Sequence, residues 1–207
     1  RPSPEAQASL RAWITGGGRL VALHGTNAAL DMGGPTGVVA PDCFPDFADT
    51  LGSQFIAHPP IEPYTVTNAA PDHWLVEGID RFETTDELYL MRHPDRAALE
   101  PLLVTHWRGT TDSFDVSDWT TDDDERLVQY LRPLGTGAVL YNTLGHCRGH
   151  YDMQPLQDWW PTVDRGSWEL PEYRKLLRRA IRWGLGASSG PTPEQPDDRH
   201  RQPRHHS

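Results

Sequence analysis

The chain has 207 residues, of which 37% are hydrophobic and 23% are charged, which suits the core and surface of one domain. Its formal net charge is -10, and its one basic cluster lies at the end of the chain, so we do not expect it to bind nucleic acid. No apolar run approaches the ~20 residues that span a bilayer, so we expect no membrane insertion. The two cysteines form no CxxC pair, which favours reduced thiols and a cytoplasmic location.

The first elements are typical of the second half of a βαβ unit. Residues 4–14 predict a helix with Ser3 as its N-cap and Pro4 in its first turn, and three glycines at 16–18 end it. Residues 19–23 are an almost entirely apolar strand, of the kind that is buried on both faces of a parallel sheet. Because a βαβ unit needs a strand before its helix, and the chain begins at Arg1, we expect the first strand of the fold to be missing.

The rest of the chain predicts further strands and one long closing helix. A Gly/Pro-rich loop over residues 25–45 is followed by a short helix at 44–51. Gly135-Thr136-Gly137 predicts a hairpin turn, and residues 112–125 an acidic loop. The domain ends near residue 186, after which we expect disorder. Strands are expected at 54–57, 64–67, 87–91, 101–107, 127–131 and 138–143, and the final helix at 171–185.

Three histidines stand directly after predicted strands: His24, His58 and His146. In open α/β sheets, ligands bind beyond the carboxyl ends of the strands. Imidazoles there bind a divalent metal such as zinc, transfer protons or hydrogen-bond a polyol, and the alternative is ordinary loop histidines bonded to backbone. We expect the three to converge, with Glu87 or Asp152 as a fourth ligand or as a partner that orients a ligand.

Residues 145–152 form the densest polar cluster of the sequence. Gly145 allows backbone to approach a ligand closely, and Arg148 suits an anionic or hydroxyl group. His146 and His150 have a spacing that favours metal binding on a helix, but here it lies in a predicted loop. We expect Asp152 to orient an imidazole.

Asp86 and Glu87 stand at the start of a predicted strand, where a carboxylate is either a general base or part of a solvated turn. Cys147 adjoins His146, but no strand–nucleophile–helix elbow surrounds it, which argues against a catalytic thiol.

Six stretches, in order along the chain, resemble the ThuA-like (trehalose utilisation) family. The resemblance runs from about Ser3 to Gly186, although Trp74 replaces a proline that the family usually has. The stretches are GGGRLVALHG at 16–25, LGSQFIAHPP at 51–60, PDH and VEGI within 71–79, DELY at 86–89, GTGAVLYNTLGH at 135–146 and RKLLRRAIRW at 174–183.

The resemblance implies a class I glutamine amidotransferase-like, flavodoxin-type fold that lacks its opening strand–helix–strand. Such a fold is an α/β structure with a mostly parallel sheet, helices on both faces and an antiparallel extension, here expected from Tyr64 to Leu140. His24 and Gly25 occupy the place of the superfamily's nucleophilic cysteine, so glutamine amidotransferase activity is not expected.

The family is associated with the use of trehalose and related sugars through 3-keto-sugar intermediates. The resemblance therefore implies a carbohydrate-processing enzyme that acts by acid–base chemistry on a keto-sugar or glycoside derivative. Glu87 or His24 would be the base, and His146 the acid or the group that polarises the carbonyl. The remaining substrate-binding candidates are Gly25, Thr26, His58, Tyr89, Arg148, His150 and Asp152.

The alternative is a non-catalytic sugar-binding or scaffold module, which the 8 tryptophans fit equally well. In either case the expected partner is a small carbohydrate, and the sequence leaves a homo-oligomer open.

Overall fold

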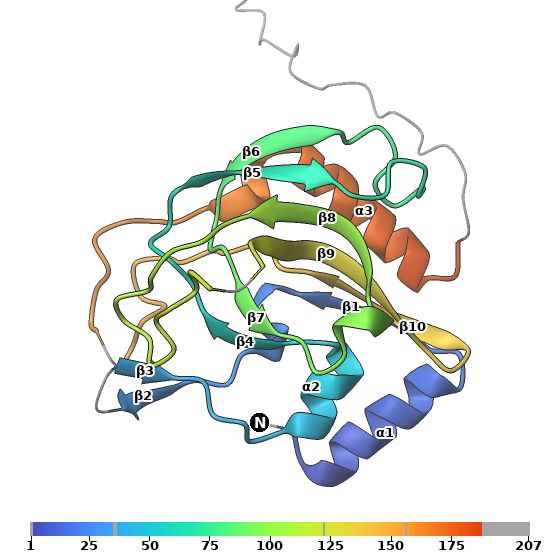
Figure 1. The fold of residues 1–207 in the computed structure, drawn as a ribbon, viewed down its shortest axis with the longest axis horizontal. Coiled ribbons are helices and arrows are strands. Elements are labelled where there is room, and N and C mark those ends of the chain that lie inside the picture. The colour runs from blue at the N-terminus through green and yellow to red at the C-terminus, as the bar shows by residue number, and fades with distance from the viewer. Residues whose placement is uncertain (1, 35–36, 122, 156, 188–207) are drawn as a thin grey trace, which may run out of the picture.

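The computed structural model describes residues 2–34, 37–121, 123–155 and 157–187, so the tail that the sequence predicts to be disordered lies, from residue 188 on, outside the described residues (Figure 1). The helices are α1 (Pro4–Thr15), α2 (Pro45–Leu51) and α3 (Pro171–Gly184), with short 3₁₀-helices η1 (His24–Asn27), η2 (Arg96–Ala98) and η3 (Gly166–Glu169). The strands are β1 (Arg19–Leu23), β2 (Asp31–Gly34), β3 (Gly37–Val39), β4 (Gln54–Ala57), β5 (Pro63–Asn68), β6 (Arg81–Thr85), β7 (Leu90–Arg92), β8 (Glu100–His106), β9 (Glu125–Leu134) and β10 (Gly137–Asn142).

Six strands form the main sheet, which curls in the order β1-β10-β9-β8-β5-β6 (Figure 1). β1 pairs with β10 in parallel, whereas the other neighbours in this sheet pair antiparallel. The strands β4 and β7 form a separate antiparallel pair, as do β2 and β3. The chain therefore has an α/β fold with a mixed sheet, and the expectation of a mostly parallel sheet is wrong. The Gly135-Thr136 turn makes β9 and β10 antiparallel, because a tight turn can join only antiparallel strands, and longer loops join the antiparallel pairs β5–β6 and β8–β9.

The helices contact the main sheet mostly at the edge formed by β1 and β10. Ile14 of α1 packs in one hydrophobic cluster with Val139 and Tyr141 of β10, whereas Tyr173 of α3 packs in another cluster with Leu140. Because side chains alternate across a strand, α1 and α3 lie on opposite faces of β10. The main helix–strand contacts involve β1 and β10, so helices covering both faces of the whole sheet, as a flavodoxin-type fold would have, are not confirmed.

Local sequence signals placed several elements correctly. The Ser3 hydroxyl accepts a hydrogen bond from the N–H of Ala6 at 3.2 Å, as expected of the N-cap of α1. The segment 25–45, which the sequence predicts to be a loop without regular structure, contains most of η1 and the β2–β3 pair. β6 was missed because only its second and fourth residues, Phe82 and Thr84, are buried, which makes a short and weak alternating pattern.

The predicted strand at 87–91 is also corrected, because β7 begins only at Leu90. The N–H of Glu87 donates to the carboxylate of Asp86 at 2.8 Å, which takes it out of strand pairing. Glu87 therefore lies in a loop between β6 and β7.

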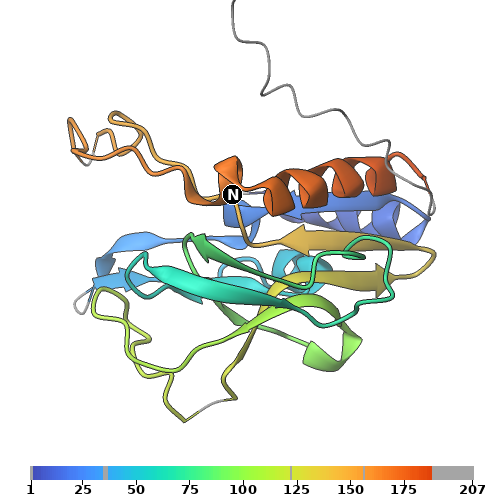
Figure 2. The same cartoon turned by 90° about the horizontal axis from the view of Figure 1, so that it is seen from above.

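The parallel pairing of β1 with β10 decides where the site lies. The register places Leu23, the last residue of β1, opposite Asn142, the last residue of β10. The residues that follow, His24 and Thr143, therefore leave the sheet at the same end. Described residues between β10 and α3, drawn in orange, extend away from the sheet at that end (Figure 2).

Candidate functional site

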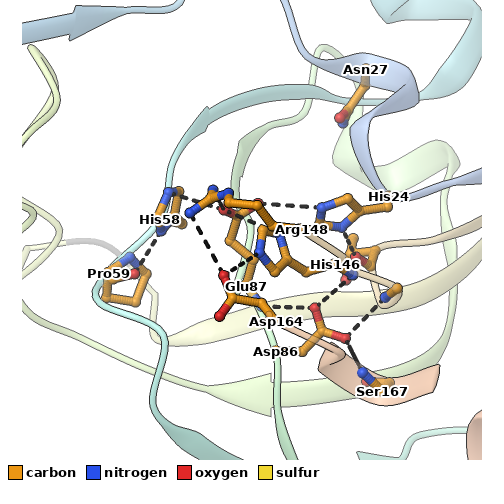
Figure 3. Close-up of polar contacts among 12 residues, drawn as sticks. His24, Asn27, His58, Pro59, Asp86, Glu87, His146, Arg148, Asp164 and Ser167 are labelled. Atoms are coloured by element: carbon orange, nitrogen blue, oxygen red, sulfur yellow. Dashed lines mark hydrogen bonds and ion pairs between the residues drawn. The ribbon is translucent and has the colours of Figure 1, made fainter. Parts of the chain in front are cut away.

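A buried carboxylate, that of Glu87, is surrounded by the three histidines that follow predicted strands (Figure 3). Nε2 of His24 lies 3.3 Å from Oε2 of Glu87, and Nε2 of His58 lies 3.3 Å from Oε1. Nδ1 of His146 lies 3.5 Å from the same Oε1. The structure thus brings together residues that are more than 100 positions apart in the chain.

His24 occupies a strained turn directly after β1. Its φ of 39° is the one positive value among the described non-glycine residues, and a conformation of this kind costs on the order of 1–3 kcal/mol. The Tyr141 hydroxyl holds the turn, because it donates to the His24 carbonyl at 2.5 Å and accepts the N–H of Asn27 at 3.1 Å. Nδ1 of His24 lies 2.8 Å from the carbonyl oxygen of Thr143, which only accepts, so the proton sits on Nδ1. The free nitrogen, Nε2, therefore faces Glu87.

His58 repeats this arrangement from a different strand. It follows β4 directly, and its Nδ1 donates to the carbonyl oxygen of Pro59 at 2.7 Å. The ring of Phe114 meets the imidazole edge-on at a centroid distance of 5.0 Å. With Nδ1 occupied and the ring held in place, Nε2 of His58 also faces Glu87 with its lone pair.

His146 is the most buried of the three imidazoles, with 6% of its side chain exposed. β10 ends at Asn142, so His146 follows from a loop and not directly from the strand, which corrects the predicted strand end. Its Nε2 lies 3.4 Å from the Asp164 carboxylate. Burial lowers the pKa of His146 and so does Arg148, but the carboxylates of Glu87 and Asp164 outweigh them and raise it.

The charge of Glu87 is stabilised by this surrounding. Burial by itself raises the pKa of the Glu87 carboxyl group, but His146, His24 and His58 outweigh burial and hold it well below its ordinary value. A group of such low pKa stays ionised at neutral pH and accepts protons poorly. Glu87 therefore suits holding a cation or orienting imidazoles better than it suits the role of a general base.

Asp86, the neighbour of Glu87, anchors the loops that carry the site. Its carboxylate is buried, and Oδ1 accepts the N–H groups of Glu87 at 2.8 Å and His146 at 3.0 Å. Oδ2 accepts the N–H groups of Gly145 and Ser167, both at 2.9 Å, and the Ser167 hydroxyl at 2.5 Å. The sequence presents Asp86 as one of a pair of candidate carboxylates, and these hydrogen bonds make it a positioning residue.

Arg148 closes the site on the side of the loop that follows His146. Its guanidinium lies 4.0 Å from Oε1 of Glu87 and 3.7 Å from Oδ2 of Asp164. The same group stacks over the ring of Trp160, 4.7 Å from its centroid. Arg148 therefore links the charged group around Glu87 to an aromatic surface. Figure 3 shows its contacts with the charged group.

The aromatic surface continues along this loop. The ring of His150 stacks on Trp159 at a centroid distance of 5.2 Å, and its Nδ1 donates to the carbonyl of Trp160 at 2.7 Å. Trp159 is 51% exposed and Tyr151 is 66% exposed. His150 thus belongs to this aromatic surface and not to the group around Glu87.

The remaining predicted residues have local roles. Tyr89 is buried, and its ring packs 4.7 Å from the ring of His24. Burial and the charges of Glu87 and Asp86 raise the pKa of Tyr89, which keeps its hydroxyl neutral.

Gly25 and Thr26 belong to η1, where the Thr26 hydroxyl donates to the carbonyl of Leu23 at 2.6 Å. Asp152 accepts the N–H of Gly149 at 2.5 Å, so the predicted role of orienting an imidazole falls to Asp164. No motif in the sequence pointed to Asp164, since it lies 18 residues beyond His146.

One group of side chains has metal-binding geometry in the described part of the chain. Donor atoms of His24, Glu87 and His146 all lie within 4.8 Å of one another. His58 contacts Glu87 but falls outside that group, which alters the predicted set of three histidines.

A cavity of about 660 Å³ lies elsewhere, and its lining includes Arg11, Asp49 and His93 but none of the predicted site residues. Its charges pair with each other, as Arg11 and Asp49 do at 2.6 Å, so we place the chemistry at Glu87 and not in this cavity. Among the described helices, none is long and apolar enough to cross a membrane.

Comparisons with known proteins agree on one family. The family model named ThuA, described as trehalose utilisation, matches residues 2–160. A ThuA-like protein from Parabacteroides merdae has a TM-score of 0.62 at 15% identity, covering 92% of this chain and 69% of that one. A second, from Bacteroides uniformis, has a TM-score of 0.57 at 14% identity, covering 89% and 65%. At these identities the two structures support the fold alone, and this chain spans about two thirds of their length. No curated protein matches the sequence.

Proposed function

Since the chain belongs to the ThuA (trehalose utilisation) family, we propose that it is a carbohydrate-processing enzyme that moves a proton next to the carbonyl group of a keto sugar or a keto-glycoside. The observation that carries the proposal is the meeting of three imidazoles and one ionised carboxylate at the end of β1 and β10. Residues of these types at such distances are what enolisation needs.

Different residues of the cluster remove the proton and stabilise the oxygen in this proposal. Enolisation requires a base for the carbon-bound proton and a positive or proton-donating group for the developing oxygen anion. His146 is the proton-donating group for this oxygen, because the carboxylates of Glu87 and Asp164 raise its pKa. Donor atoms of His24, Glu87 and His146 lie within 4.8 Å of one another and form a compact group.

The base in this proposal is His58. It lies outside the compact group, it is the most exposed of the three imidazoles, and its Nε2 carries the lone pair because Nδ1 donates to Pro59. This assignment replaces Glu87 as the base, because the low pKa of Glu87 makes it a weak proton acceptor.

Exchange with deuterated solvent tests the proposal directly. The protein is incubated in D₂O with a 3-keto-glucoside, and deuterium uptake next to the carbonyl is followed by NMR. We expect uptake with the wild-type chain and a loss of ~100-fold or more in His58→Gln. His106→Gln, which removes an exposed imidazole paired with Asp124, is the matched control and should exchange like wild type. No uptake by the wild-type chain contradicts the proposal.

A second candidate function is sugar binding without turnover, and the exposed aromatic surface around Trp159 and Tyr151 favours it. Aromatic faces of this kind are suited to stacking on sugar rings. Under this alternative, binding of the 3-keto-glucoside survives in His24→Ala and Glu87→Ala, and no deuterium enters the sugar. Glutamine amidotransferase activity is not proposed, because His24 stands where the acyl-enzyme route needs a thiol.

A further inference from the structure

We propose that the cluster holds a divalent transition-metal ion, with Nε2 of His24, Nδ1 of His146 and the carboxylate of Glu87 as its protein ligands. The presence of the ion is inferred from geometry alone, whereas its catalytic role rests on the function proposed above.

The hydrogen bonds on the outer side of each ring decide which nitrogen is free. Nδ1 of His24 bonds the carbonyl oxygen of Thr143 at 2.8 Å, and Nε2 of His146 lies 3.4 Å from the carboxylate of Asp164. Both partners only accept, so each outer nitrogen carries the proton in a neutral ring. The two nitrogens that face Glu87 then carry lone pairs. A carbonyl or carboxylate behind a histidine is also the usual way in which a metal-binding imidazole is oriented.

The distances to Glu87 fit ligands of one ion better than they fit hydrogen bonds. Nε2 of His24 lies 3.3 Å from Oε2 of Glu87, and Nδ1 of His146 lies 3.5 Å from Oε1, so the two rings face the two oxygens of one carboxylate. A charge-assisted N–H···O bond is shorter, at about 2.7–2.9 Å. Two ligands that each lie ~2.0–2.1 Å from the same ion at a tetrahedral angle are about 3.3–3.4 Å apart.

The ligands are held before any ion arrives. Asp86 accepts the backbone N–H groups of both Glu87 and His146, which ties two ligands to one buried carboxylate. His24 is held by its strained turn and by the hydroxyl of Tyr141. Little conformational entropy remains to be lost when the ion binds.

Three protein ligands leave positions open for a substrate oxygen. Two imidazoles and one carboxylate suit zinc, cobalt, manganese or iron better than calcium or magnesium. An ion there would polarise a keto-sugar carbonyl and stabilise the enolate oxygen, while His58, outside the three ligands, removes the carbon-bound proton. The ion thus supplies the positive charge that the proposed reaction needs.

The test is metal binding by the whole chain without an added histidine tag. The protein is stripped with a chelator and titrated with Co²⁺, followed by visible absorption, and with Zn²⁺, followed by calorimetry. We expect one tight ion per chain, with cobalt bands of a four- or five-coordinate site. In Glu87→Gln and His24→Ala the affinity should fall ~100-fold or more. The control His106→Gln should bind like wild type, and the terminal histidines contribute the same weak background to every variant.

The inference is overturned if the wild-type chain binds Co²⁺ no more tightly than Glu87→Gln does. Should circular dichroism show that His24→Ala does not fold, Asp164→Asn takes its place. It keeps all three proposed ligands, removes the charge behind His146 and beside Arg148, and should cost ~10–100-fold in affinity. A bound ion without deuterium exchange supports this inference and contradicts the proposed function. Exchange that persists in the stripped protein supports the function and contradicts the role of the ion.

Discussion

Asp86 and Glu87 are adjacent buried carboxylates with opposite surroundings. Asp86 accepts five hydrogen bonds, from four backbone N–H groups and the Ser167 hydroxyl, at 2.5–3.0 Å. Glu87 instead faces the ring nitrogens of His24, His58 and His146 at 3.3–3.5 Å. The first carboxylate has its hydrogen-bonding capacity filled by short bonds from the chain itself, and the second does not.

This difference separates a structural carboxylate from a functional one. A buried charge is tolerated when it is hydrogen-bonded, as Asp86 is, and it then holds loops together. A buried charge that faces imidazoles and a guanidinium at longer distances, as Glu87 does, keeps its capacity for a cation or a substrate. The same residue class, one position apart, therefore gives stability in one case and chemistry in the other.

The largest effect should come from Asp86→Ala, which removes the acceptor for four backbone N–H groups, three of them buried. Leaving such donors without partners costs about 3–5 kcal/mol in total. Urea denaturation followed by circular dichroism measures the change in unfolding free energy. In the stripped protein Glu87→Gln should stay within about 1 kcal/mol of wild type. Equal destabilisation by the two variants removes the distinction between the two carboxylates.

Glu87→Gln should lower the rate of deuterium exchange ~100-fold or more while the fold is kept. The amide has nearly the shape of the carboxylate but lacks the charge that attracts a cation and orients three imidazoles. Exchange kinetics with a 3-keto-glucoside, at matched circular dichroism, measure this effect. A rate within threefold of wild type shows that the charge of Glu87 is not used.

Trp159→Ala tests whether the loop that follows His146, which Asp86 holds at its start, also binds the substrate of the site at Glu87. The exposed ring, backed by His150, offers a face for a sugar, so its loss should weaken keto-glucoside binding about fivefold, or ~1 kcal/mol. Calorimetric titration measures the affinity. Trp13→Ala, an equally exposed tryptophan on α1, is the matched control and should leave the affinity unchanged.

The smallest effect concerns His93, a histidine outside the site. Burial lowers its pKa, the charges of Arg96 and Arg126 add to this, and the hydrogen bond to Gly52 opposes it. The unfolded chain then takes up the proton more readily than the folded chain. Stability should therefore fall as the pH drops through the ordinary value of about 6.5, by at most about 1.4 kcal/mol per pH unit. Urea denaturation between pH 7.5 and 5.5 should show a shallower slope in His93→Gln, and an unchanged slope would place the proton uptake on other groups.

Local signals account for the parts of the fold that were predicted. The Ser3 cap and Pro4 define the start of α1, and Gly135-Thr136 defines the turn between β9 and β10. These features depend on residues a few positions apart, so the sequence contains all of their physical cause. Whether strands pair parallel or antiparallel depends on partners far along the chain. The expected antiparallel extension from Tyr64 to Leu140 is confirmed, whereas the expected mostly parallel sheet is wrong.

The candidate site divides in the same way. The sequence by itself determined that His24 and His58 follow strands and that two carboxylates stand together, because short apolar runs end at polar residues. Only the tertiary structure decided that Asp86 binds Gly145 and Ser167, 59 and 81 positions away, and that Asp164, not Asp152, stands behind His146. Hydrogen bonds between such distant residues form only after the sheet has brought the loops together, so no local pattern records them.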